Sequence, residues 1–168
     1  MMPVPKRQKY GRLFAALAVS LLILLAAYYF IFSSRQTVLR ISDWETGEVY
    51  IERPVLPGDE LFFGWMHSLD QFPWNEYFRI DENLNLILDT ISFTAFGAGV
   101  PHNKGRVRIK NGIIYMSEIN QKFTEIVWIN SPATQEIRVA GELVTRGTEL
   151  PHDRRLVLAV ERRNFFGN

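Results

Sequence analysis

The segment from residue 61 to residue 80 holds the side chains best suited to chemistry. It reads LFFGWMHSLDQFPWNEYFRI and places His67, Ser68 and Glu76 among aromatic residues. Histidine, hydroxyl and carboxylate side chains are the usual participants in acid–base and nucleophilic catalysis. The same types can instead bind a ligand or a metal ion. This segment is therefore the first candidate for a functional site.

Two aromatic strands flank a loop over residues 68–73, and we expect them to pair as a hairpin. If His67 lies opposite Trp74, then Trp65 lies opposite Glu76, and all four side chains share one face. His67 and Glu76 would be diagonal neighbours, with Cβ atoms about 7 Å apart. A carboxylate on an apolar face needs a hydrogen-bond donor. Three roles stay open for this pair: a structural network that fixes the loop, ligand binding, or catalysis.

The sequence argues for binding rather than catalysis. Adjacent residues on a strand point to opposite faces, so His67 would serve Ser68 as a base only across a sharp turn, and no G-x-S-x-G motif is present. His67, Glu76 and His102 are suitable metal-ligand types but lack a spacing motif. We predict no catalytic residue, no metal ligand and no cofactor.

A second dense segment, residues 93–102, reads FTAFGAGVPH. Gly97 and Gly99 permit either a tight turn or a run of exposed backbone N–H groups that would hold an anion. The segment lacks the G-x-G-x-x-G spacing of a dinucleotide site and the Lys-Ser/Thr of a P-loop. A strained turn packed beneath aromatic rings is the structural alternative.

Aromatic residues are the third feature that points to a site. The loop tip Phe72-Pro73-Trp74 would close over a ligand or dock a partner. Other aromatic side chains would line a pocket or form the core, and they are Trp44, Trp65, Trp128, Phe62, Phe63 and Phe96.

Short apolar runs separated by turn residues must position these side chains. From residue 37 onward the pattern predicts an all-β domain, an antiparallel sandwich or distorted barrel of about ten short strands. Asn111-Gly112 has the sequence of a two-residue hairpin turn. The expected strands are Val38–Ser42, Glu48–Arg53, Glu60–His67, Trp74–Ile80, Leu86–Phe93, Arg106–Lys110, Ile113–Ser117, Phe123–Ile129, Glu136–Val139, Leu143–Thr145 and Leu156–Glu161.

The N-terminal part has a different character. Residues 13–32 form a twenty-residue apolar stretch with Ser20 as its one polar side chain, long enough to cross a bilayer as a helix. Four basic residues precede it and only Arg35 follows closely, which places the N-terminus in the cytoplasm. The bulky residues 28–32 argue against a cleaved signal peptide.

We therefore predict a single-pass protein of the cell membrane with four parts. The parts are a cytoplasmic basic flank over 1–12, a transmembrane signal anchor over 13–32, a short tether over 33–36 and an extracytoplasmic β domain over 37–168.

Charge and cysteine content exclude two classes. Five of the 19 basic residues precede residue 37, whereas all 18 acidic residues follow it, so the β domain has an excess of four negative charges. Nucleic-acid binding, which needs a basic surface, is excluded as a function. The chain has no cysteine, so it forms neither a disulfide nor a thiolate metal site.

The two dense segments together resemble a family of small bacterial extracytoplasmic proteins known as domain of unknown function eighteen-fifty. The matching residues are Trp65-x-His67-Ser68, then Pro73-x-x-Glu76-x-Phe78, then Phe93-x-x-Phe96-Gly97-Ala98-Gly99-Val100-Pro101. Members are often encoded beside, or fused to, subunits of TRAP-type transporters of the TAXI class. The resemblance implies an accessory role near such a transporter and carries over His67, Ser68, Glu76, Gly97 and Gly99 as site positions.

We therefore expect a membrane-anchored accessory or binding module associated with a TRAP-type (TAXI) solute transporter. The alternatives are an extracytoplasmic hydrolase that uses Ser68, His67 and Glu76, and a structural envelope-interaction domain. The predicted ligand- or partner-binding residues are His67, Ser68, Pro73, Trp74, Glu76, Phe96, Gly97, Gly99 and His102.

Overall fold

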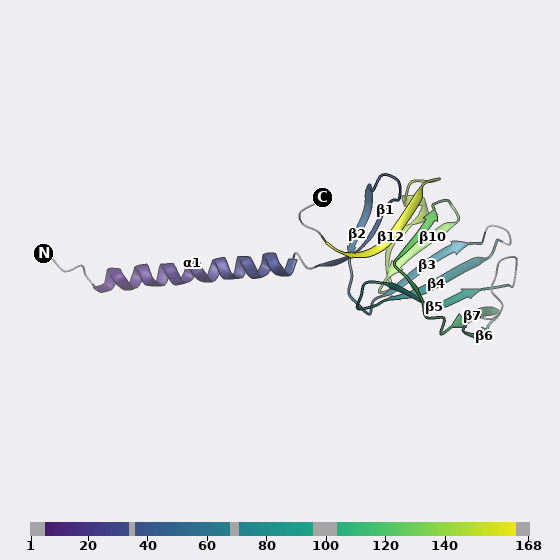
Figure 1. Ribbon diagram of the computed structural model, residues 1–168, viewed down its shortest axis with the longest axis horizontal. Coiled ribbons are helices and arrows are strands. Elements are labelled where there is room, and N and C mark those ends of the chain that lie inside the picture. Colours follow the sequence, from purple (N-terminus) through teal and green to yellow (C-terminus); the bar gives the residue numbers. More distant parts are fainter. Residues whose placement is uncertain (1–5, 34–35, 68–70, 96–103, 164–168) are drawn as a thin grey trace. The chain divides into compact units, whose positions relative to one another are not determined.

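The computed structural model describes residues 6–33, 36–67, 71–95 and 104–163. The chain divides into two units, of which the second is Thr37–Arg162, and each unit is described by itself. Figure 1 shows one helix near the N-terminus and a domain built from strands.

The first unit contains one helix, α1 (Lys6–Ser33). Within it the side chains of residues 14–29 are described, and all are exposed. The Ser20 hydroxyl donates to the Ala16 carbonyl at 3.0 Å. Among the described residues, no helix is long and apolar enough to span a membrane. The expectation that residues 13–32 cross a membrane stays a prediction.

The β domain contains a smaller sheet of four antiparallel strands in the order β2-β1-β12-β9. Buried and partly exposed positions alternate along β12, one of its two inner strands, as expected for a sheet with one face on a core. The strands are β1 (Thr37–Asp43), β2 (Val49–Pro54), β9 (Glu125–Ile129) and β12 (Arg155–Arg162).

The larger sheet has eight antiparallel strands in the order β11-β10-β3-β4-β5-β7-β6, with β8 also paired to β5. A short 3₁₀ helix, η1 (Gly147–Glu149), follows β11. The strands are β3 (Glu60–Met66), β4 (Pro73–Ile80), β5 (Leu86–Phe93), β6 (Arg106–Lys110), β7 (Ile113–Ser117), β8 (Gln121–Phe123), β10 (Thr134–Val139) and β11 (Glu142–Arg146).

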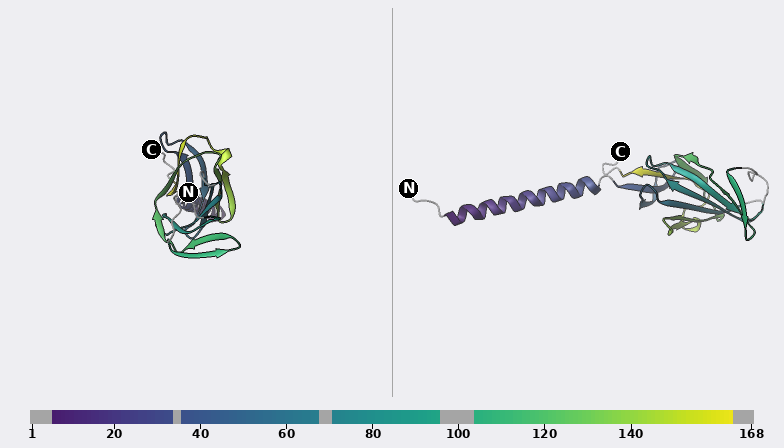
Figure 2. Two further views of the ribbon diagram at one scale, coloured as in Figure 1. Left: turned by 90° about the vertical axis from the view of Figure 1, so that its right-hand side faces the viewer. Right: turned by 90° about the horizontal axis from the view of Figure 1, so that it is seen from below.

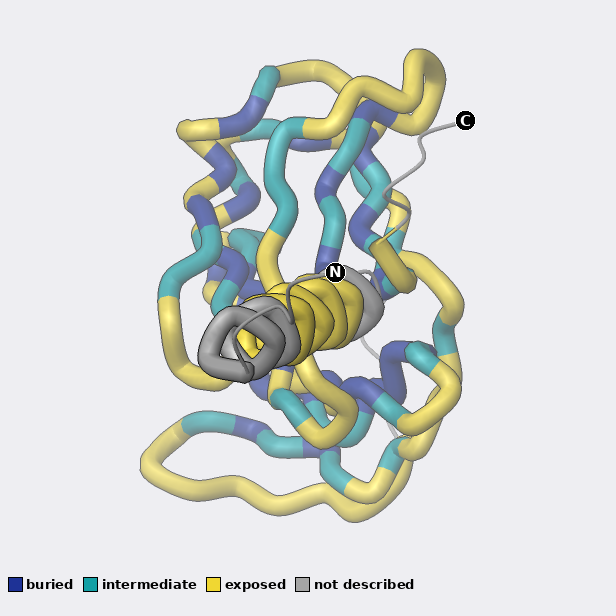
Figure 3. The backbone as a smooth tube through the Cα atoms, turned by 90° about the vertical axis from the view of Figure 1, so that its left-hand side faces the viewer, coloured by how far each residue is buried: buried dark blue, intermediate teal, exposed yellow. Residues whose placement is uncertain are grey.

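The two sheets lie face to face around one hydrophobic core (Figures 1 and 2). Leu39 and Leu158 of the smaller sheet and Phe93 and Met116 of the larger sheet are almost completely buried. Buried positions alternate with more exposed ones along the strands, while the turns between strands are exposed (Figure 3). Within the described residues no strand of one sheet pairs with the other, so the predicted sandwich is confirmed and the barrel alternative is wrong.

Local sequence signals placed most strands correctly. The predicted hairpin turn forms, because Asn111 and Gly112 have φ values of 53° and 77°, as a two-residue turn of this kind requires. The predicted strand Phe123–Ile129 is instead two strands. Phe123 pairs with β5 of the larger sheet, whereas residues 125–129 pair with β12 of the smaller sheet, so the chain changes sheets at Thr124.

The predicted register of the β3–β4 hairpin is wrong by two residues. Trp65 lies opposite Trp74, and Glu76 lies opposite Phe63. The hairpin is tighter than expected, because His67 donates its backbone N–H to the Phe72 carbonyl at 2.8 Å. A shift of two positions keeps every side chain on its predicted face, since side chains alternate with a period of two.

Candidate functional site

Glu76 is the one ionisable side chain on the inward face of β4. Its partner on β3 is Phe63, and its partner on β5 is Ile91, both buried in the core. The neighbouring inward residues on β4, Trp74 and Phe78, are also buried. The alternation of the strand therefore places a carboxylate among apolar side chains.

One indole group donates a hydrogen bond to this carboxylate, from Trp74 Nε1 to Glu76 Oε1 at 3.0 Å. The Trp65 indole lies nearby and, like that of Trp74, favours the ionised form of Glu76. Burial raises the pKa of Glu76 above its ordinary value, and the Trp74 and Trp65 indole groups oppose that rise. Among the described residues, no basic side chain forms an ion pair with Glu76. The carboxylate is hydrogen-bonded but has no compensating positive charge there.

Glu76 lines a cleft of about 390 Å³ between the two sheets. On the far side lies β9, one of the two edge strands of the smaller sheet, and its Trp128 packs edge-on against Phe63 of β3, with ring centroids 5.2 Å apart. The inward-facing Trp128 and Ile126 of β9 and Trp65 of β3 are only partly buried, so the cleft opens to solvent. The lining residues are Phe63, Trp65, Met66, Glu76, Ile126, Val127, Trp128, Ile129, Ser131, Ala133 and Thr134.

The segment that closes the cleft after β9 is held by Asn130, whose side chain is fully buried. Its Nδ2 donates to the backbone carbonyls of Gly147, Leu150 and Pro151 at 2.9, 3.3 and 3.1 Å. Gly147 packs directly against the Thr134 carbonyl, with no room for a larger side chain. These contacts fix residues 131–134, the polar rim of the cleft.

His67 belongs to a neighbouring aromatic stack rather than to the cleft. Its ring stacks on Phe72 with centroids 5.0 Å apart and on Trp65 with centroids 5.7 Å apart. The expected contact between His67 and Glu76 is wrong, because the Trp65–Trp74 pair lies between them in the ladder. The shift in register causes this separation.

The other predicted site residues lie in different environments. Trp74 is buried and stacks on Phe93 with centroids 5.0 Å apart. It is therefore a core residue as well as the hydrogen-bond donor to the Glu76 carboxylate. Pro73 is exposed at the start of β4. The remaining predicted residues lie outside the described part of the chain, and they are Ser68, Phe96, Gly97, Gly99 and His102.

The described residues contain no group of three or more side chains able to hold a metal ion. The chemistry that the cleft offers is therefore that of its own lining: aromatic faces, one carboxyl group, and the hydroxyls of Ser131 and Thr134. Such a mostly apolar cleft with a few polar groups is typical of a small-molecule site.

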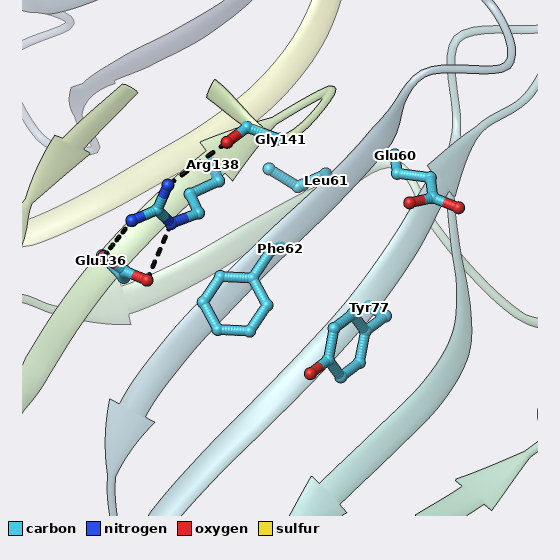
Figure 4. Close-up of a pocket in the computed structure, with 7 residues that line it drawn as sticks. All are labelled: Glu60, Leu61, Phe62, Tyr77, Glu136, Arg138 and Gly141. Carbon is cyan, nitrogen blue, oxygen red and sulfur yellow. Dashed lines mark hydrogen bonds and ion pairs between the residues drawn. The ribbon is translucent and has the colours of Figure 1, made fainter. Parts of the chain in front are cut away.

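The outer face of the larger sheet carries a second depression of about 320 Å³, which Figure 4 shows. Phe62 and Tyr77 pack edge-on there, with centroids 5.3 Å apart. Two of the charged groups that line it, Arg138 and Glu136, are paired with each other. Arg138 donates to both carboxylate oxygens of Glu136 at 2.8 and 3.0 Å and to the Gly141 carbonyl at 3.2 Å. This paired charge makes the outer depression a weaker candidate than the cleft.

Sequence reasoning named Trp128 as a pocket or core residue but did not place its strand, β9, opposite Glu76. The alternation of Ile126 and Trp128 with exposed neighbours indicates one buried face, but no local signal pairs this strand with Glu76, which is fifty residues away. Ser131 and Thr134 were missed for the same reason.

Comparison with known proteins agrees with the resemblance drawn from the motifs. A family model described as Domain of unknown function (DUF1850) matches residues 62–149, which run from within β3 through β11 and include the residues that line the cleft. No curated protein and no solved structure matches the chain. The match spans more than half of the sequence, and the chain therefore belongs to the DUF1850 family.

Proposed function

We propose that this protein is a membrane-anchored extracytoplasmic binding module whose ligand site is the cleft around Glu76. The carrying observation is a partly buried carboxyl group that lines a solvent-accessible, aromatic cleft, with no basic partner among the described residues. An ionisable group in such a place costs folding free energy. Its presence there therefore points to a functional role.

Anchoring is the second part of the proposal, and its support comes from residues 13–32. That stretch is apolar on all sides, and it includes residue 13 and residues 30–32, whose side chains lie outside the described part. Its one polar side chain, Ser20, bonds to its own helix, which removes the cost of an unpaired hydroxyl in lipid. Basic residues before the stretch orient the β domain outward.

The third part is an accessory role beside a TRAP-type transporter of the TAXI class. Its support is the resemblance to proteins encoded next to such transporters. A tether of four residues would hold the cleft near the membrane surface, where a transporter subunit or its solute is available. Genes that neighbour this one would give the first check.

The test uses the full-length protein, tagged at its C-terminus and purified from native membranes in detergent. Co-purification of TRAP subunits, identified by mass spectrometry, supports the accessory role. Glu76→Gln and Trp128→Phe alter the cleft, and Tyr77→Phe, on the opposite face of β4, is the matched control. Transport-dependent growth that is the same for wild type and both cleft variants, with no transporter subunit recovered, contradicts the proposal.

A purely structural domain remains the second candidate. Its specific support is the hydrogen bond from Trp74 to Glu76, which also stabilises the β4 strand. It predicts that Glu76→Gln changes stability and leaves transport and co-purification intact. The hydrolase alternative, which uses Ser68, His67 and Glu76, receives no support from the register of β3 and β4, because the Trp65–Trp74 pair lies between His67 and Glu76. Ser68 lies outside the described residues.

A further inference from the structure

The cleft combines a carboxyl group with aromatic walls supplied by both sheets. Trp65 comes from β3 of the larger sheet and Trp128 from β9 of the smaller sheet, and Glu76 lies on β4 beside them. We propose that this cleft binds a small organic ammonium cation, with Glu76 as its counter-ion and Trp65 and Trp128 as aromatic walls. The inference rests on the proposed function and names the class of its ligand.

Aromatic rings favour a cation at this place. The face of an indole ring carries partial negative charge, and it attracts ammonium groups more strongly than the rings of tyrosine or phenylalanine. Phe63, which packs edge-on against Trp128, extends the apolar surface for the carbon part of such a ligand. The attraction increases when the cation leaves water, and a cleft between two sheets provides that environment.

Charge complementarity also favours a cationic ligand. Among the described residues, the charged side chain that lines the cleft is Glu76, and no basic side chain forms an ion pair with it. An anionic ligand would meet a like charge or force Glu76 to keep its proton. A ligand ammonium instead supplies the missing positive charge, and the Trp74 indole N–H keeps the carboxylate oriented.

Among the described residues that line the cleft, Glu76 is the one with an ionisable side chain. Phe63 on β3 and Ile91 on β5 lie opposite it, and the lining residues of β9 and of 131–134 carry no ionisable side chain. His67 lies beyond the Trp65–Trp74 pair. Because burial raises the pKa of Glu76, affinity for a cation falls as the pH is lowered through that pKa.

The test measures binding to the full-length protein in a maltoside detergent, which carries no ammonium group. Isothermal titration calorimetry at pH 8 compares choline and benzyltrimethylammonium with 3,3-dimethylbutan-1-ol, the neutral isostere of choline, and with the dianion glutarate. We expect both cations to bind at least tenfold more tightly than the isostere, a difference of about 1.4 kcal/mol or more. Equal binding of choline and its isostere overturns the inference.

Three variants locate the effect. Glu76→Gln keeps the size and the acceptor oxygen, and it should weaken cation binding at least tenfold while leaving the isostere unchanged. Trp128→Phe should weaken cation binding severalfold, because phenylalanine is the poorer cation partner. Tyr77→Phe, on the opposite face of β4, should change nothing. Unchanged cation affinity in Glu76→Gln overturns the inference, even if Trp128→Phe weakens binding.

The outcomes separate this inference from the function on which it rests. If glutarate or the isostere binds, responds to Trp128→Phe and is preferred over both cations, the ammonium class is wrong and the binding function stands. Tighter glutarate binding at lower pH would identify a protonated Glu76 that donates to an anion. If no probe binds and no transporter subunit co-purifies, both proposals fail.

Discussion

The indole Nε1 of Trp74 donates a 3.0 Å hydrogen bond to Oε1 of Glu76, two positions further along the same strand. Both side chains point inward, because residues two apart on a strand share a face. The same Trp74 ring stacks on Phe93 of the neighbouring strand. One aromatic residue thus belongs to the core and also orients the carboxyl group of the cleft.

Glu76→Gln should stabilise the protein at neutral pH. Because burial raises the pKa of Glu76, the folded state keeps a proton that the unfolded chain releases above its ordinary value of 4.5. Wild-type stability therefore falls as the pH rises from 4.5 through the raised pKa. Glutamine removes this pH dependence, and it should raise the free energy of unfolding at pH 7 by on the order of 1 kcal/mol.

Urea unfolding of wild type and Glu76→Gln between pH 4 and pH 8 measures the difference. Glu82→Gln, at an exposed turn position, is the control and should follow the wild-type curve. A variant that keeps the wild-type slope between pH 4.5 and 7 contradicts the prediction.

Trp74→Phe should lower the free energy of unfolding by about 1–3 kcal/mol, through the lost hydrogen bond and the smaller ring. With one donor fewer, the pKa of Glu76 should rise further, and stability should fall with pH over a wider range. Denaturant unfolding at several pH values measures both effects. Trp44→Phe, at a position that is 51% exposed, should change stability by less than about 0.5 kcal/mol. Equal losses in the two variants would refute the assigned role of Trp74.

Asn130→Ala should destabilise the domain and weaken the cleft together. The substitution leaves three carbonyls without their side-chain donor, at a cost of about 2 kcal/mol or more. It also releases residues 131–134, so ligand affinity should fall even where the protein stays folded. Thermal unfolding and calorimetric titration test the two effects, with the exposed Asn83→Ala as control. Full stability in Asn130→Ala would contradict the role of its hydrogen bonds.

Asp43→Asn should reduce stability at neutral pH and flatten its loss in acid. The backbone N–H of Thr46 donates to the Asp43 carboxylate at 2.9 Å and lowers its pKa below 3.8, with further help from Glu45 N–H and Arg154. A lowered folded-state pKa stabilises the protein above pH 3.8, and this contribution is lost as the pH falls through the lowered value.

Acid unfolding between pH 2 and pH 7 distinguishes wild type from Asp43→Asn. The exposed Asp153→Asn is the control. If both variants show the wild-type acid profile, the hydrogen bonds to Asp43 contribute nothing to acid stability.

Much of the fold could be predicted because its signals are local. Residues 86–93, 106–110 and 113–117 form strands with the bounds that the sequence predicted, since apolar runs and turn residues mark both ends. The division of residues 121–129 between two sheets could not be predicted. Both halves are good strands, and only the packing of the whole domain decides that Phe123 pairs with one sheet and Glu125 with the other.

The site could be predicted only in part, because strand alternation is a local signal whereas strand register and the facing of two sheets are not. Alternation along β4 correctly placed Glu76 on an apolar inward face, but the number of residues in a loop does not by itself fix the register. His67 was therefore expected beside Glu76, where the structure has the Trp65–Trp74 pair. Trp128 was expected either in a pocket or in the core, and only the facing of the two sheets shows that it lines the cleft.

The wall that carries Trp128 is an edge strand, and within the described residues β9 is paired on one side only, to β12. Edge strands open locally at lower free energy than strands with two neighbours. Backbone amides of β9 should therefore exchange with deuterium faster than those of β1, which has neighbours on both sides. A ligand that bridges Glu76 and Trp128 would slow that exchange, so its binding could be detected by mass spectrometry before the ligand is identified.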